Sequence, residues 1–157
     1  MRIDVRTTGD SAGVLLAHGD QGGGYLVAID DGAPLVSYNA YGRMHRARGA
    51  ALAPGAHRLV LRMAEQDDLR WSVELEVDDA AGLRIPSVPM LLGMAPFTGI
   101  SVGYDYGGPV DWELYERHRS YRFDGPELAV HYLPGARSAH DVTELREIDR
   151  EVARVAD

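Results

Sequence analysis

The sequence predicts an all-β fold, an antiparallel β-sandwich followed by an amphipathic α-helix. Apolar and polar residues alternate with period two along much of the chain, which is typical of strands that bury one face. Turn signals rich in Pro, Gly and Asp recur roughly every 8–12 residues, the spacing of a sandwich or barrel. Towards the C-terminus the apolar period becomes helical. We therefore expect a β-sandwich domain over residues 1–135 and a helix within residues 136–157.

Residues 71–78 give the clearest strand signal. Apolar side chains take every second position there, and Ser, Glu and Asp take the positions between them. Just upstream, Leu59, Leu61 and Met63 alternate in the same way. Residues 66–68 separate the two runs and are turn-forming, so we expect an antiparallel hairpin.

A second hairpin is expected at Asp31-Gly32, where Gly supplies the positive φ of a tight turn. Alternating residues 25–29 lead into it, and residues 35–41 return from it. Pro54-Gly55 marks another turn, and residues 128–132 form a late strand. The expected core comprises Val14, Leu16, Val27, Ile29, Leu59, Leu61, Trp71, Val73, Leu75, Leu128 and Val130.

The C-terminal helix is predicted from five apolar residues spaced by three, three, four and three positions, which places them on one helix face. Asp141 is a suitable N-cap. The apolar face either packs on the chain's own sheet or docks on a partner chain or domain. Its residues are Val142, Leu145, Ile148, Val152 and Val155.

The composition fits one globular domain and excludes several functions. The chain has 157 residues and a formal net charge of -8, which disfavours binding to nucleic acid or an anionic membrane. It has no Lys and no Cys, so lysine Schiff bases, thiolate nucleophiles and thiolate metal sites are excluded. No apolar run approaches the ~20 residues of a membrane helix, and the N-terminus lacks a signal-peptide pattern. We expect a cytoplasmic location.

Candidate chemistry read from the residues alone is sparse. Two basic clusters, residues 43–48 with Arg43 and Arg46, and residues 117–122, suit sulfate, phosphate or carboxylate groups. The alternative is that they form solvated strand faces and salt bridges. No metal-ligand spacing and no Gly-x-Ser-x-Gly motif occurs. We therefore predict no catalytic residue, no metal and no cofactor.

Five stretches of the chain resemble, in the same order, the C-terminal β-sandwich domain of bacterial arylsulfatases. The resemblance covers roughly residues 3–135, with Asp124 where that family usually has Thr. The stretches are AGVLLAHGD and GGYLV at residues 12–20 and 23–27, LVSYNAYG at 35–42, LAPGAHRL at 52–59, ISVGYDYGGPV at 100–110 and YRFDGPEL at 121–128.

The resemblance implies a jelly-roll, concanavalin-like sandwich and a noncatalytic accessory role. In that family the chemistry belongs to an N-terminal module, where a Cys or Ser in a Cys/Ser-x-Pro-x-Arg motif becomes formylglycine and a calcium ion binds the sulfate. This chain lacks that module, and residues 87–91 lack the required Arg. We therefore expect the chain to complete or cover a sulfatase catalytic module, its expected partner, and not to be an enzyme by itself.

The second hypothesis is a carbohydrate- or sulfated-glycan-binding module. Trp112, Tyr104, Tyr106 and Tyr115 could stack on sugar faces, although fold class alone is a weak argument for this role. The resemblance places Asp105 in a tight loop, where it either caps backbone groups or contacts a ligand. Our candidate ligand-binding residues are therefore Asp105, Tyr104, Tyr106, Trp112, Arg43 and Arg46. An independent hydrolase with an unrecognised site is the third hypothesis.

Overall fold

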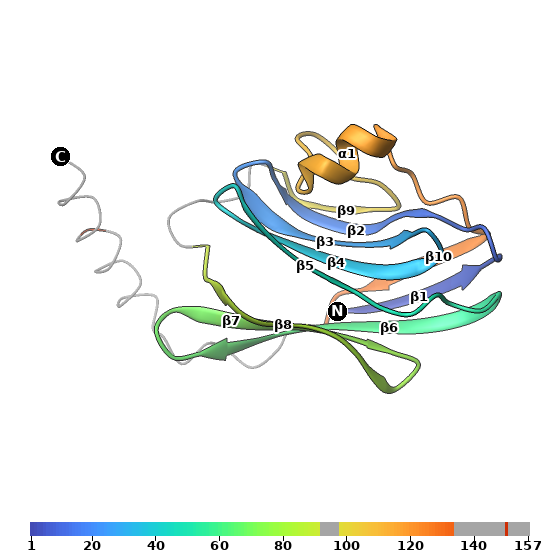
Figure 1. Ribbon diagram of the computed structural model, residues 1–157, viewed down its shortest axis with the longest axis horizontal. Coiled ribbons are helices and arrows are strands. Elements are labelled where there is room, and N and C mark those ends of the chain that lie inside the picture. The colour runs from blue at the N-terminus through green and yellow to red at the C-terminus, as the bar shows by residue number, and fades with distance from the viewer. Residues whose placement is uncertain (92–97, 134–149, 151–157) are drawn as a thin grey trace.

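The computed structural model describes residues 1–91, 98–133 and residue 150, and its described part is an all-β sandwich with one short helix (Figure 1). The predicted C-terminal helix lies outside the described residues, apart from the single residue 150. The elements are β1 (Arg2–Thr7), β2 (Gly13–Asp20), β3 (Gly23–Asp30), β4 (Ala33–Ala40), β5 (Arg43–Arg48), β6 (Gly55–Gln66), β7 (Arg70–Val77), β8 (Ala80–Pro89), β9 (Ile100–Val102), α1 (Trp112–His118) and β10 (Glu127–His131).

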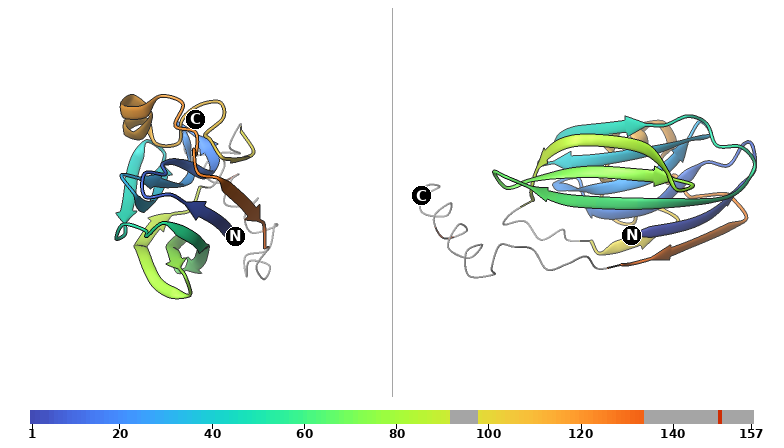
Figure 2. Two further views of the ribbon diagram at one scale, coloured as in Figure 1. Left: turned by 90° about the vertical axis from the view of Figure 1, so that its right-hand side faces the viewer. Right: turned by 90° about the horizontal axis from the view of Figure 1, so that it is seen from below.

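The strands form two antiparallel sheets of five strands each. Sheet A has the order β10-β1-β6-β7-β8, and sheet B has the order β5-β4-β3-β2-β9. The two sheets lie face to face, as the left-hand view in Figure 2 shows. The predicted antiparallel sandwich is therefore confirmed. No helix within the described residues is long and apolar enough to cross a membrane.

Tight turns of two or three residues join β2, β3, β4 and β5 in sheet B and β6, β7 and β8 in sheet A. At Asp31 and Gly32 both residues have positive φ, 47° and 73°, which matches the twist that a tight hairpin requires. The same conformation occurs at Asp68 and Leu69, with φ of 60° and 54°. Both hairpins predicted from the sequence are therefore present, with the second turn shifted slightly towards β7.

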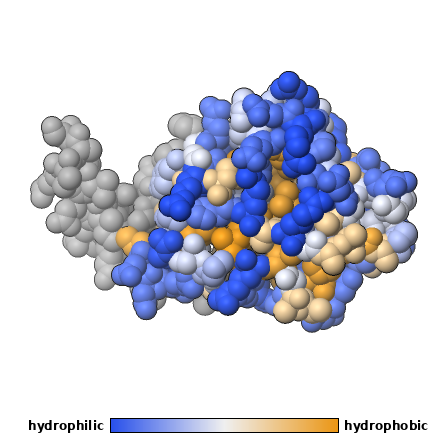
Figure 3. Space-filling model, in the orientation of Figure 1, coloured by the Kyte–Doolittle hydropathy of each residue, from blue (hydrophilic) through white to orange (hydrophobic). Residues whose placement is uncertain are grey.

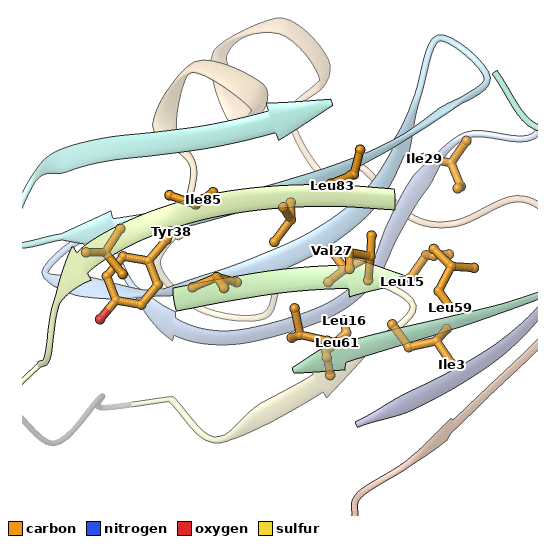
Figure 4. Packing of buried hydrophobic residues seen from close by; sticks show 14 of the residues in the cluster. Ile3, Leu15, Leu16, Val27, Ile29, Tyr38, Leu59, Leu61, Leu83 and Ile85 are labelled. Carbon is orange, nitrogen blue, oxygen red and sulfur yellow. The ribbon is translucent and has the colours of Figure 1, made fainter. Parts of the chain in front are cut away.

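The main hydrophobic core lies between the two sheets (Figure 4). Among the predicted core residues, Trp71, Leu128 and Val130 are only partly buried against it. Val14 is buried but belongs to a different cluster, because a β-bulge between Val14 and Leu16 shifts the register of β2 against β3. The remaining predicted core residues are in this cluster: Leu16, Val27, Ile29, Leu59, Leu61, Val73 and Leu75.

Sheet B is covered on its outer face as well, so all eight residues of β4 are buried. The cover is residues 103–123, here called the covering segment, which include α1. A second apolar cluster lies beneath it, and in Figure 1 α1 lies over the sheet B side of the sandwich. The cluster contains Val14, Ala17, Leu26, Ala28, Leu35, Val110 and Leu114, with Tyr121 packed against it.

The two outer faces of the sandwich differ in character. Sheet A exposes cross-strand ion pairs such as Arg62 with Glu76 and Arg84 with Glu74, at 2.9 and 3.1 Å. The space-filling view, in the orientation of Figure 1, shows apolar residues across the middle of the molecule with hydrophilic residues above and below them (Figure 3). Sheet B therefore differs from sheet A, because the covering segment packs on its outer face as a third layer.

Gly13 is expected to be essential for seating the covering segment. Its φ is 120°, and a Cβ there would lie 2.3 Å from the carbonyl oxygen of Arg122. We expect Gly13→Ala to lower the free energy of unfolding by ~3 kcal/mol or more, because both strain and a backbone clash arise. Gly42→Ala is the matched control, with φ of 89° and open space around the new Cβ. It should cost only ~1 kcal/mol. Urea unfolding measures both, and equal costs would contradict the account.

Candidate functional site

A cavity of about 240 Å³ lies between the covering segment and the outer face of sheet B. The buried residues of its lining include Val14, Leu26 and Leu114. The half-buried residues include Tyr104, Asp105, Tyr115 and Tyr121, and the exposed ones include Tyr106, Arg119 and Arg122. The cavity therefore combines an apolar base with phenol rings and two guanidinium groups near the solvent.

The loop at residues 103–110 is held by its own carboxylate. Asp105 Oδ2 accepts a hydrogen bond from the backbone N–H of Val110 at 2.8 Å, which closes the loop. On the other side of the same residue, Asn39 Nδ2 donates to the Val110 carbonyl oxygen at 3.1 Å. Gly103 and Gly107 supply the positive φ values, 80° and 101°, that the tight path requires.

Asp111 anchors the start of α1 to the sheet. Its carboxylate accepts two hydrogen bonds of 2.7 Å from Arg46 and one of 2.7 Å from the Ser37 hydroxyl. It also caps α1 by accepting from the N–H of Leu114 at 3.1 Å. Burial raises the pKa of Asp111, but the hydrogen bonds from Arg46, Ser37 and Leu114 outweigh that effect and hold the pKa below its usual value.

Asp30 anchors the end of α1 in a similar way. Arg48 lies 2.7 Å and Arg117 3.3 Å from Oδ2, and the hydroxyl of Tyr121 donates to Oδ1 at 3.1 Å. His118 Nε2 lies 3.2 Å from the same Oδ1. Burial raises the pKa of Asp30, yet the hydrogen bonds from Arg48 and Tyr121, aided by the Arg117 charge, lower it overall. Both ends of the helix are thus tied to sheet B.

Two aromatic pairs line or flank the cavity. Tyr104 and Tyr106 pack edge to face with ring centres 5.8 Å apart. Trp112 packs on Tyr115 with ring centres 5.4 Å apart. An arginine lies over one ring of each pair, Arg122 over Tyr104 at 4.0 Å and Arg119 over Tyr115 at 5.7 Å.

Asp105 has a buried carboxylate oxygen, Oδ1, without a hydrogen-bond partner among the described residues, which is unfavourable in a folded protein. Burial raises the pKa of Asp105 to about 6, and the charges of Asp111 and Asp20 add to that effect. The hydrogen bond from Val110 acts in the opposite direction and is too weak to compensate. The carboxyl can therefore change its protonation state just below neutral pH.

The structure brings together three of the six residues predicted for a ligand site, namely Tyr104, Asp105 and Tyr106. Trp112 is outside the lining, on α1, where its indole N–H donates to Glu116 at 3.0 Å. Arg46 is engaged by Asp111 and Glu113. Arg43 lies on β5 and does not line the cavity.

The cavity is also lined by residues that were not among the ligand-binding residues predicted from the sequence. Tyr121 was missed because its packing partners lie far away in the chain. Arg119 and Arg122 belong to the second basic cluster, at residues 117–122, and their short spacing could have indicated an anion-binding site. Tyr115 had been considered only as a sugar-stacking residue, which its place in the lining allows.

A larger cavity of about 460 Å³ lies beside sheet A, and the histidine in its lining has partners for both ring nitrogens. There His57 contacts Asp78 through Nδ1 and the Ala53 carbonyl through Nε2, both at 2.7 Å. Burial lowers the pKa of His57, but these hydrogen bonds raise it overall. Neither ring nitrogen is free to act as a base. In the part of the chain that the structure describes, no three His, Asp or Glu side chains are grouped to hold a metal ion.

Comparison with known proteins gives no assignment: no protein-family model and no curated protein matches this sequence.

Removal of Arg46 should destabilise the fold strongly, because it leaves the buried Asp111 carboxylate without its cation. We expect Arg46→Met to lower the free energy of unfolding by ~3 kcal/mol. Arg43→Met on the same strand is the matched control, and its exposed side chain should change stability by no more than ~0.5 kcal/mol. Thermal and urea unfolding measure both variants. A small effect of Arg46→Met would show that the Asp111 network does not hold the covering segment.

Asp105 should make the protein less stable as the pH rises. The pKa of Asp105 in the folded protein, about 6, lies above its ordinary value of 3.8, so its favourable contribution is complete below pH 3.8 and is lost through pH 6. Asp105→Asn removes that loss and should raise the free energy of unfolding at pH 7.5 by ~2 kcal/mol, with little difference at pH 4. Urea unfolding at both pH values checks this. A variant less stable at pH 7.5 would mean that the ionised carboxylate stabilises the fold.

Proposed function

We propose that this chain is a noncatalytic accessory domain of an arylsulfatase-like sulfuric ester hydrolase, completing or covering a catalytic module. One observation carries the proposal. Two of the stretches that resemble the arylsulfatase C-terminal domain meet at one residue, because Asn39 of LVSYNAYG bonds the Val110 carbonyl and Asp105 of ISVGYDYGGPV bonds its N–H. The resemblance therefore rests on residues that depend on one another in the fold.

The noncatalytic part of the proposal follows from the chemistry of these residues. Asp105 and Asn39 hold backbone groups, so their motif positions have an architectural use that needs no reaction. Among the described residues, neither cavity pairs a Ser nucleophile with a free basic nitrogen. Catalysis would then belong to the module that the family resemblance implies.

A surface suited to contact with such a module lies at the open edge of the sandwich. Ile100 and Val102 of β9 are each 45% exposed, and Tyr132 and Leu133 after β10 are 64% and 57% exposed. In Figure 2 the strands β9 and β10 lie along the same edge. Exposed apolar residues gathered at one edge favour contact with another protein surface.

Immunoprecipitation of sulfatase activity tests the proposal. An antibody against this domain should remove 4-nitrophenyl sulfate hydrolysis from an extract of the source cells and recover it in the precipitate. An unrelated antibody is the control. We expect the purified chain alone not to hydrolyse the substrate, because the described part of the chain shows no activated nucleophile at either cavity. An extract that keeps all its activity after the domain is removed would contradict the accessory role, and turnover by the purified chain would favour an independent hydrolase.

The second candidate function is a carbohydrate-binding module, and the cavity favours it. Tyr104 and Tyr115 present rings to a concave site, and aromatic faces stack on the apolar faces of sugar rings. The buried lining is apolar, while Asp105 and the two arginines supply the few placed polar groups that small-ligand sites use. This function does not exclude the first, since an accessory domain can bind part of a substrate.

A further inference from the structure

We infer that the cavity under the covering segment binds a monosaccharide-sized ring that carries one anionic group, and that Arg119 and Arg122 hold the anion. The inference rests on the second candidate function and names its ligand class. The shared chemistry is an oxyanion on a sugar ring, whether a sulfate ester, a phosphate ester or a carboxylate.

The first support is that neither Arg119 nor Arg122 has a carboxylate partner among the described residues. Eight of the other described arginines bind carboxylates, whereas Arg43, Arg70 and Arg150 form no ion pair within the described residues. Arg119 and Arg122 form no ion pair within the described residues, and the guanidinium group of each lies over a tyrosine ring. In a chain with 24 acidic and 16 basic residues, carboxylate partners are in excess. The paired arginines are Arg2, Arg6, Arg46, Arg48, Arg58, Arg62, Arg84 and Arg117.

The backbone at Arg119 gives a second, independent support. This residue ends α1 with φ of 57° and ψ of -125°, a conformation that glycine adopts far more readily than any L residue with a side chain. Such strain costs on the order of 1–3 kcal/mol and concentrates at ligand sites. An arginine at this position is therefore unfavourable for the fold, and its guanidinium lies at the cavity, where a ligand can use it.

The positions of the guanidinium groups fit anion binding. Arg122 lies over the Tyr104 ring at 4.0 Å and Arg119 over the Tyr115 ring at 5.7 Å, so each planar group is pre-oriented by an aromatic face. The planar fork of arginine matches the oxygens of sulfate, phosphate or carboxylate. Both side chains are exposed at the cavity, so an anion can reach them without rearrangement of the core.

The rest of the cavity sets the size and polarity of the ligand. Its volume of about 240 Å³ is below the range of roughly 300–1,000 Å³ for sites of drug-sized ligands, which favours a single ring. Val14, Leu26 and Leu114 provide an apolar base for a ring face. The unpartnered Oδ1 of Asp105 supplies an acceptor for a ring hydroxyl, which would give this buried oxygen its missing partner.

Calorimetric titration of the purified chain tests the inference. The probes are the 6-sulfates of glucose, galactose and N-acetylglucosamine, with glucose 6-phosphate, glucuronate and the neutral parent sugars. We expect at least one charged probe to bind at least tenfold more tightly than its neutral parent, and the effect to weaken with added salt. Comparison of sulfate, phosphate and carboxylate identifies the anion that the site prefers.

Two variants link binding to the arginines. Arg119→Gly should relieve the backbone strain and raise the unfolding temperature, yet weaken binding of the charged probe about tenfold. Arg122→Gln should weaken it to a similar degree. Arg62→Gln, on the outer face of sheet A, is the control and should leave binding unchanged.

Each contrary result has its own meaning. Equal binding of charged and neutral sugars, with no loss in the two variants, would overturn the anion inference and leave the carbohydrate-binding function standing. No heat from any probe at about 10 mM would overturn both. Neither result bears on the accessory role, which the immunoprecipitation decides.

Discussion

Two buried carboxylates on the outer face of sheet B hold the rest of the candidate site in place. Asp111 and Asp30 are 2% and 1% exposed, and each binds an arginine of the edge strand β5 at 2.7 Å. Asp111 caps the start of α1, and Asp30 meets its end through Arg117. A buried charge without its partner is strongly unfavourable, so the covering segment has one well-defined position in which both carboxylates are satisfied.

As a result, the outer face of sheet A is exposed to solvent, whereas the covering segment packs on the outer face of sheet B. Sheet A exposes a set of cross-strand ion pairs that are screened by solvent and individually worth little. The central strands β2, β3 and β4 of sheet B are almost entirely buried, so the cavity beneath the covering segment has a rigid base. Two features that cost stability lie at this cavity: the buried Oδ1 of Asp105 and the backbone conformation of Arg119. Features that cost stability and gather at one cavity favour a binding role.

Local sequence patterns were sufficient to predict many of the strands but not β8 or the third layer. Alternation over residues 71–78 and the turn at Asp31-Gly32 were enough because each depends on neighbouring residues only. The helix α1 has seven residues, about two turns, which is too short for a helical period to stand out. The network that holds it joins Arg46 to Asp111, residues that are 65 positions apart, so no local spacing indicates it.

The difference between local patterns and contacts distant in the chain also explains which residues of the candidate site could be predicted. Tyr104, Asp105 and Tyr106 were found because one motif contains all three. Tyr121 was missed because its hydroxyl bonds the carbonyl of Ile29, which is 92 positions away. Arg46 was proposed as a ligand residue because its charge is visible in the sequence, whereas its buried partner Asp111 is not recognisable as one without the fold.

If the covering segment on sheet B forms the functional site, sulfated sugars should perturb its residues. Backbone amide NMR spectra of the isotope-labelled chain, recorded during titration with glucose 6-sulfate, galactose 6-sulfate and N-acetylglucosamine 6-sulfate, test it most directly. We expect at least one of them to shift the signals of residues 103–110 and 119–122 and to leave those of β6 and β7 unchanged. Shifts confined to sheet A, or no shifts with any of the three, would contradict this expectation.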